Sequence, residues 1–126
     1  MNRSRRQILI IDDEPYILKS LQRILDDSYN VITALGGQVA LDALSQKNLQ
    51  YDVIICDLSM PDVSGADFYH RISESYPGLE KRIIFMTGGA YTDDLKEFIS
   101  HVENSCLDKP FEQEELVHAI EKMIST

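Results

Sequence analysis

VIICDLSMPDVSG, residues 53–65, begins with four apolar residues and turns polar at Asp57. A short apolar run bounded by turn-forming residues is typical of a strand that is covered on both faces. The same pattern recurs along the chain. The apolar runs are Ile8–Ile11, Val31–Ala34, Val53–Cys56, Ile83–Met86 and a weaker one around Cys106 and Leu107.

Apolar residues at helical spacing separate these runs. Three stripes are clear, and weaker helical patterns occupy 38–46, after Gly36-Gly37, and 66–76, before Pro77-Gly78. The clear stripes are Ile17, Leu21, Ile24 and Leu25, then Leu95, Phe98, Ile99 and Val102, then Leu116, Ile120, Met123 and Ile124. The alternation predicts an α/β fold, a doubly wound parallel sheet of five strands flanked by five helices. We expect a single domain over residues 1–126, with 1–6 as a flexible tail.

Composition narrows the function classes. Of the 126 residues 44% are hydrophobic and 26% charged, which is typical of globular proteins. The net charge of −9 argues against a nucleic-acid surface, because such surfaces cluster Lys and Arg. The sequence contains neither a signal-peptide core nor a run long enough for a membrane helix, so we expect a cytoplasmic protein without membrane contact.

The two cysteines fit no metal or disulfide pattern. Neither Cys56 nor Cys106 belongs to a CxxC or Cys/His motif. Both fall in expected strands, and we therefore expect buried free thiols.

Polar residues follow four of the five runs. Ligands of a doubly wound sheet bind beyond the carboxyl ends of its strands, so these residues form the candidate site. They are Asp12-Asp13, Asp57, Thr87-Gly88-Gly89 and Asp108-Lys109-Pro110.

Three converging carboxylates, Asp12, Asp13 and Asp57, would raise one another's pKa unless a cation neutralised them. Oxygen ligands suit Mg²⁺, which takes one or two protein carboxylates together with phosphate oxygens. Asp57 could then attack phosphorus as a nucleophile. Lys109 would supply a positive charge and Thr87 a hydroxyl donor to the transferred group.

Simpler readings exist for each feature. Asp13 could cap the first helix, which Pro15 would open. Asp57 and Lys109 could form an ordinary salt bridge, and Gly88-Gly89 could be a tight turn. Neither GxxxxGK[ST] nor GxGxxG is present. The functional reading is favoured because all the polar candidates follow strands of one sense.

These motifs together resemble the response-regulator receiver family, also called CheY-like domains. ILIIDDEP, VIICDLSMPDVSG, IIFMTGG and CLDKPF carry the resemblance in order, and it spans residues 7 to 125. It implies a flavodoxin-like sheet in the order 2-1-3-4-5, in which strands three and five lie about 9–10 Å apart, so Cys56 and Cys106 cannot form a disulfide.

The resemblance also implies residue roles. Asp57 would be the phosphoacceptor, phosphorylated by a histidine kinase or its phosphotransfer domain. Mg²⁺ would be bound by Asp13, Asp57 and the Ser59 carbonyl, with Asp12 assisting through water. Thr87 and Lys109 would contact the phosphoryl group. Pro61 and Gly65 would shape the loop after Asp57, and Lys109-Pro110 would be a cis peptide.

The implied function is that of a phosphoacceptor in a two-component phosphorelay, a signalling domain rather than an enzyme, which regulates a downstream target or an attached domain. Two departures are Cys106, where many receivers have Tyr or Phe, and Gly88, where Ala is usual. MTGG and NSCLDKPF look like receivers attached to hybrid sensor kinases. Two alternatives stay open: a pseudo-receiver that acts by protein contacts alone, and a flavodoxin-like cofactor binder.

Overall fold

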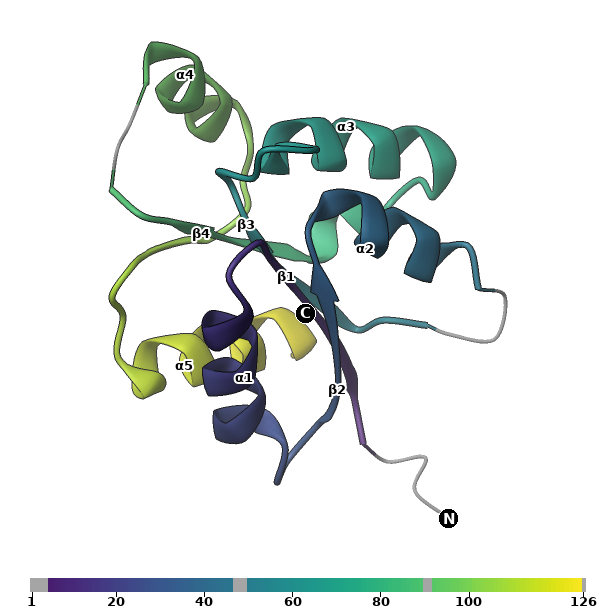
Figure 1. Cartoon of the computed structure of the whole chain (residues 1–126), viewed down its shortest axis with the longest axis vertical. Helices are drawn as coiled ribbons and strands as arrows, with labels where there is room; N and C mark the ends of the chain where they lie inside the picture. Colours follow the sequence, from purple (N-terminus) through teal and green to yellow (C-terminus); the bar gives the residue numbers. More distant parts are fainter. Residues whose placement is uncertain (1–4, 47–49, 90–91, 126) are drawn as a thin grey trace.

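Strands and helices alternate along the chain in the computed structural model, which describes residues 5–46, 50–89 and 92–125 (Figure 1). All five expected strands are present among these residues. Four of them end in the polar residue that follows the apolar run, because hydrogen-bonded pairing continues through it. The strands are β1 (Gln7–Asp12), β2 (Asn30–Leu35), β3 (Val53–Asp57), β4 (Ile83–Thr87) and β5 (Cys106–Asp108).

The five expected helices are present as well. Helix α1 begins at Pro15, whose fixed φ suits the first helical position. A short 3-10 helix, η1 (Leu79–Arg82), was not expected. The α-helices are α1 (Pro15–Leu25), α2 (Gly37–Leu44), α3 (Gly65–Ser75), α4 (Asp93–His101) and α5 (Gln113–Ile124). Val102, which the apolar stripe placed in α4, is the extended residue that follows the helix.

The sheet has the order β2-β1-β3-β4-β5, and every neighbouring pair is parallel. Both the doubly wound architecture and the strand order are confirmed. The chain therefore reverses its winding direction at β1, so the carboxyl ends of β1 and β3 lie side by side.

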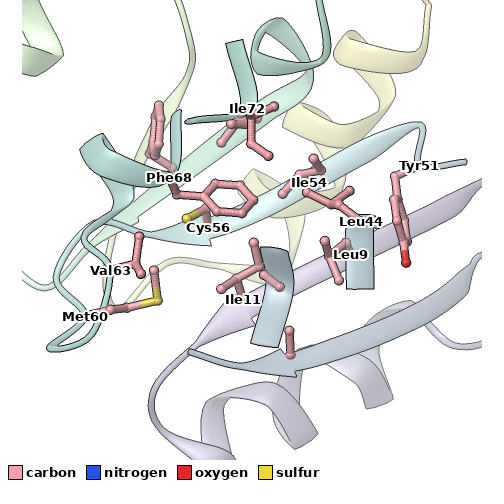
Figure 2. Packing of buried hydrophobic residues seen from close by; sticks show 14 of the residues in the cluster. Leu9, Ile11, Leu44, Tyr51, Ile54, Cys56, Met60, Val63, Phe68 and Ile72 are labelled. Atoms are coloured by element: carbon pink, nitrogen blue, oxygen red, sulfur yellow. The ribbon is translucent and has the colours of Figure 1, made fainter. Parts of the chain in front are cut away.

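Helices cover both faces of the sheet. One cluster of buried residues lies between the sheet and α2, α3 and α4, and the other lies between the sheet and α1 and α5. Figure 2 shows the first cluster, where Phe68 and Ile72 of α3 meet Ile54 of β3 and Ile11 of β1. Residues 8–11, 53–56 and 83–86 are fully buried, as their apolar runs predict.

At the edges of the sheet the prediction of two covered faces is wrong. Thr33 and Leu35 of β2 are exposed, and Cys106 of β5 is only partly buried, whereas Cys56 is buried. An edge strand pairs with a neighbour on one side only and is therefore more exposed. An apolar run in the sequence does not show whether its strand lies at an edge of the sheet. Both cysteines are free thiols, as expected.

The first two described residues, Arg5 and Arg6, both contact the rest of the domain. Residues 1–4 lie outside the described residues, but Arg5 donates a hydrogen bond to the Asp27 carbonyl and Arg6 lies 3.5 Å from the Asp52 carboxylate. No helix of the described residues is long and apolar enough to cross a membrane.

Candidate phosphoacceptor site

Asp12, Asp13 and Asp57 converge at the carboxyl ends of β1 and β3. Each offers a carboxylate oxygen, and the three oxygens all lie within 4.8 Å of one another. Asp12 and Asp57 are 0% and 4% exposed, while Asp13 is exposed. The strand register explains the convergence, since Ile11 pairs with Cys56 and the next residue on each strand is one of the acids.

Lys109 completes the charge arrangement from the carboxyl end of β5. Its Nζ donates to Asp12 Oδ2 at 2.8 Å and lies 3.5 Å from Asp57 Oδ1. Burial alone would lower the pKa of Lys109, but the bond with Asp12 and the charge of Asp57 outweigh it and raise that pKa. Lys109 therefore stays protonated. Asp57 and Lys109 do form the salt bridge that the sequence allowed. This bridge belongs to a cluster of four charged groups, which are Asp12, Asp13, Asp57 and Lys109.

Asp57 is the most perturbed carboxylate. Burial and the charge of Asp12 raise its pKa to about 6, against the smaller opposing effects of Lys109 and the Ser59 amide. The Ser59 N–H is 3.5 Å from Asp57 Oδ1, a long contact. One positive charge thus does not compensate three neighbouring acids, which is the electrostatic condition in which a further cation is stabilising.

The two carboxylate oxygens of Asp12 accept different hydrogen bonds. Oδ1 accepts the Glu14 N–H at 3.0 Å, and Oδ2 accepts Lys109. The alternative that Asp13 caps α1 is wrong, because the residue at the cap position is Glu14, whose own side chain makes no capping hydrogen bond. The exposed Asp13 carboxylate has no capping role and faces the same cluster.

Thr87 lies at the end of β4, one residue beyond Met86, the partner of Asp57. Its side chain is buried, and its Oγ1 accepts the Gly89 N–H at 3.3 Å. Its carbonyl accepts the Lys109 N–H at 2.7 Å, which joins the ends of β4 and β5. Gly89 has φ +98°, so the Gly88-Gly89 turn does use the freedom of glycine.

The loop after Asp57 is closely packed. A β-carbon on Gly65 would lie 2.8 Å from the Asp57 carbonyl oxygen, so only glycine allows α3 to begin there. The Lys109-Pro110 peptide is cis, as expected.

Sequence reasoning missed one residue of this region. Asp62 lies in the loop between β3 and α3 and accepts hydrogen bonds from the amides of Gly37 and Gln38 in α2. Only the glycine pair Gly36-Gly37 at the start of α2 hinted that this helix lacks a side-chain cap of its own.

Comparisons with known proteins agree with this geometry. The family model described as the response regulator receiver domain matches residues 8–121. The chain is 33% identical to the two-component response regulator ORR26 of Oryza sativa, over 87% of this chain and 19% of that protein. It is 32% identical to the response regulator ArlR of Staphylococcus aureus, over 94% of this chain and 52% of that one. The chain thus spans about half or less of the length of these relatives.

Solved structures show the same fold. A response regulator receiver domain from Clostridium thermocellum superposes with a TM-score of 0.82 at 30% identity, covering 95% of this chain and 94% of that one. The receiver domain of a sensor histidine kinase from Pseudomonas aeruginosa, with magnesium in its active-site cleft, gives 0.83 at 24% identity, covering 98% and 100%. The chain therefore belongs to the response regulator receiver domain family, whose general function is to accept a phosphoryl group in two-component signalling.

Proposed function

We propose that Asp57 accepts a phosphoryl group from a phosphohistidine of a histidine kinase or its phosphotransfer domain, with Mg²⁺ bound beside it. A carboxylate oxygen of Asp57 forms the new bond to phosphorus as the phosphorus–nitrogen bond of the phosphohistidine breaks. The products are an acyl phosphate on Asp57 and a free imidazole. The observation that carries the proposal is the crowding of Asp12, Asp13 and Asp57 around a single lysine.

The donor set fits Mg²⁺. It consists of carboxylate oxygens, two of them buried, and the ligands we assign are Asp13, Asp57 and the Ser59 backbone carbonyl, with Asp12 acting through water. When bound, the ion neutralises charge that develops on the phosphoryl oxygens. The magnesium in the cleft of the Pseudomonas receiver, a protein of the same fold, supports this assignment.

The remaining residues orient the phosphoryl group. Lys109 is anchored by Asp12 and has its Nζ already beside Asp57, so it can donate to a phosphoryl oxygen with little rearrangement. Thr87 accepts the Gly89 N–H through its oxygen, which leaves its hydroxyl hydrogen available to donate to a phosphoryl oxygen. Movement of Thr87 toward the phosphoryl group would then shift the segment that leads into α4.

The effect of phosphorylation on a partner is a further part of this proposal. We propose that phosphorylation changes the affinity of this domain for a downstream protein or an attached domain, because its relatives are named as response regulators and it spans only part of their length. Cys106 and Gly88 differ from the residues usual in receivers. We therefore infer that other side chains transmit the change from Thr87 to the surface that contacts the partner.

The test uses a small phosphodonor, acetyl phosphate, with MgCl₂ and the purified chain, followed by intact mass. We expect one phosphoryl group on the wild type, none on Asp57→Asn, and wild-type uptake by Asp67→Asn, a matched control on the exposed side of α3. Chelation of the metal should abolish uptake. Equal labelling of Asp57→Asn would remove Asp57 from this role, and a wild type that neither binds Mg²⁺ nor takes the label would favour the pseudo-receiver.

A further inference from the structure

The start of α2 lacks a cap from its own segment. The residue at the cap position is Gly36, with φ +92°, and the first turn contains no acidic residue. The N–H groups of the first helical turn have no partner inside a helix and require one elsewhere. In α2 the partner is Asp62, whose Oδ1 accepts Gly37 N–H at 3.3 Å and whose Oδ2 accepts Gln38 N–H at 2.9 Å.

The negative charge of Asp62 favours its contact with the start of α2. Hydrogen bonds from the amides of Gln38, Val63 and Gly37 lower the pKa of its carboxyl, so the carboxylate stays charged at neutral pH. A negative group at a helix amino terminus also interacts favourably with the helix dipole. Asp62 lies 24 residues after Gln38, so its contact with the start of α2 is a tertiary contact rather than local capping.

The surfaces on either side of this bond fit closely. A β-carbon on Gly37 would lie 2.7 Å from Val63 Cβ and 2.9 Å from the Val63 carbonyl oxygen. Val63 and Met60 are buried, and Figure 2 shows both pointing from their loop toward the cluster near Ile11. The loop from Leu58 to Ser64 therefore packs directly against the first turn of α2.

The same end of α2 also reaches β1. The Gly36 N–H donates to the Asp12 carbonyl at 3.0 Å. The start of α2 is thus hydrogen-bonded both to a residue of the acidic cluster and, through Asp62, to the loop that carries Ser59. At the other end of that loop, Gly65 N–H donates to the Leu58 carbonyl at 3.0 Å.

We propose that Asp62 is a positioning residue, which holds the loop after Asp57 against α2 and so keeps the Ser59 carbonyl where it can bind the metal. The proposal rests on the function proposed above. Asp62 does not itself touch the reacting atoms. Outer residues that orient metal ligands commonly change metal affinity by tenfold or more when they are removed.

The experiment compares Asp62→Ala and Asp62→Asn with Asp67→Ala, which removes the same charge from an exposed position in the first turn of α3. Mg²⁺ affinity is measured by NMR titration of backbone amides near Asp57, well below the unfolding temperature. We expect a loss of about tenfold in Asp62→Ala and no change in Asp67→Ala. Asp62→Asn keeps one acceptor oxygen and should recover part of the affinity.

A second readout needs no metal. Hydrogen exchange of the Gly37 and Gln38 amides should accelerate in Asp62→Ala, because these amides lose their partner. Faster exchange with unchanged Mg²⁺ affinity would reduce Asp62 to a structural cap and overturn the proposal. An equal loss of affinity in Asp67→Ala would also overturn it, because simple charge would then explain the effect.

Two further outcomes are separable. If Asp62→Ala fails to fold, the Asp62→Asn variant carries the comparison, and wild-type affinity there with disrupted Gly37 and Gln38 amides overturns the proposal. If the wild type binds Mg²⁺ but takes no phosphoryl group, the function proposed above fails while the role of Asp62 in metal binding is still decided by the titration.

Discussion

Helices α1 and α4 both flank the sheet with an apolar stripe, but they bury that stripe to different degrees. Leu18, Leu21 and Leu25 of α1 are buried, whereas no residue of α4 is. Phe98 of α4 rests edge-on against Tyr69 and Phe85, with ring centroids 5.5 and 5.4 Å apart, and stays partly exposed. The helix beside the acidic cluster is thus firmly packed, and the helix that follows Thr87 is lightly held.

This difference matters for signalling. A change at Thr87 reaches α4 first along the chain, and a helix with few buried contacts can shift at a low free-energy cost. The acidic cluster, which we propose binds the metal, must by contrast stay in place through the reaction. We therefore expect phosphorylation to change the position of α4 and to leave α1 unmoved.

The largest expected contrast is in core truncations. Leu21→Ala should reduce the free energy of unfolding by about 3 kcal/mol, and Leu95→Ala by about 1 kcal/mol, because only Leu21 leaves a closed cavity. Urea denaturation of both variants measures the two values. Equal losses would mean that α4 is as firmly packed as α1.

The glycines give the next contrast. Gly37→Ala should cost about 2 kcal/mol of stability, because its β-carbon would overlap Val63. A β-carbon on Gly88 meets nothing within 4 Å, so we expect Gly88→Ala to change stability by less than about 0.5 kcal/mol. Thermal unfolding of the pair checks this. A stable Gly37→Ala variant would show that the contact between α2 and the loop can relax.

Hydrogen exchange compares the helices directly. Backbone amides in the middle of α4 should exchange at least about tenfold faster than those in the middle of α1 in the unphosphorylated protein, since lightly packed segments open locally. Exchange measured by NMR resolves individual amides. Similar protection in the two helices would contradict a distinct low-stability segment.

Asp57→Asn should raise stability at neutral pH by about 1 kcal/mol in metal-free buffer. The pKa of Asp57 is raised from 3.8 to about 6 in the folded protein, so the unfolded state releases its proton first and the wild type loses stability as pH rises through this interval. The full shift overstates the gain, because the variant also removes a partner of Lys109. Denaturation at pH 7 and below pH 4 checks the sign, since the advantage of Asp57→Asn should vanish at the lower pH.

The sequence predicted the sheet well because its central strands are uniformly apolar and end in polar residues. It placed Asp12, Asp13, Asp57 and Lys109 at one edge because parallel strands share the sense of their ends. The limits lie in long-range contacts. The spacing of apolar residues does not show that Leu35 lies on an edge strand, or that the apolar side chains of α4 are only partly buried. Both features depend on which segments pack nearby in the fold.

Asp62 shows the same limit within the site region. Nothing in MPDVSG signals that this acid caps a helix formed by earlier residues. The bond exists because two segments far apart in sequence meet at the carboxyl ends of β1 and β3, and that meeting is a property of the fold. Asp13 shows the opposite error. The sequence allowed it to cap α1, but in the structure the cap position is occupied by Glu14.

The crowding of the acidic cluster is measured most directly by the pKa of Asp57, followed by carbon-13 NMR of its carboxyl group with and without Mg²⁺. Without the ion we expect a pKa of about 6, set by burial and the charge of Asp12, and a marked fall when Mg²⁺ is added. An ordinary carboxyl pKa that Mg²⁺ leaves unchanged would contradict the assignment of this cluster as a metal-dependent phosphoacceptor site.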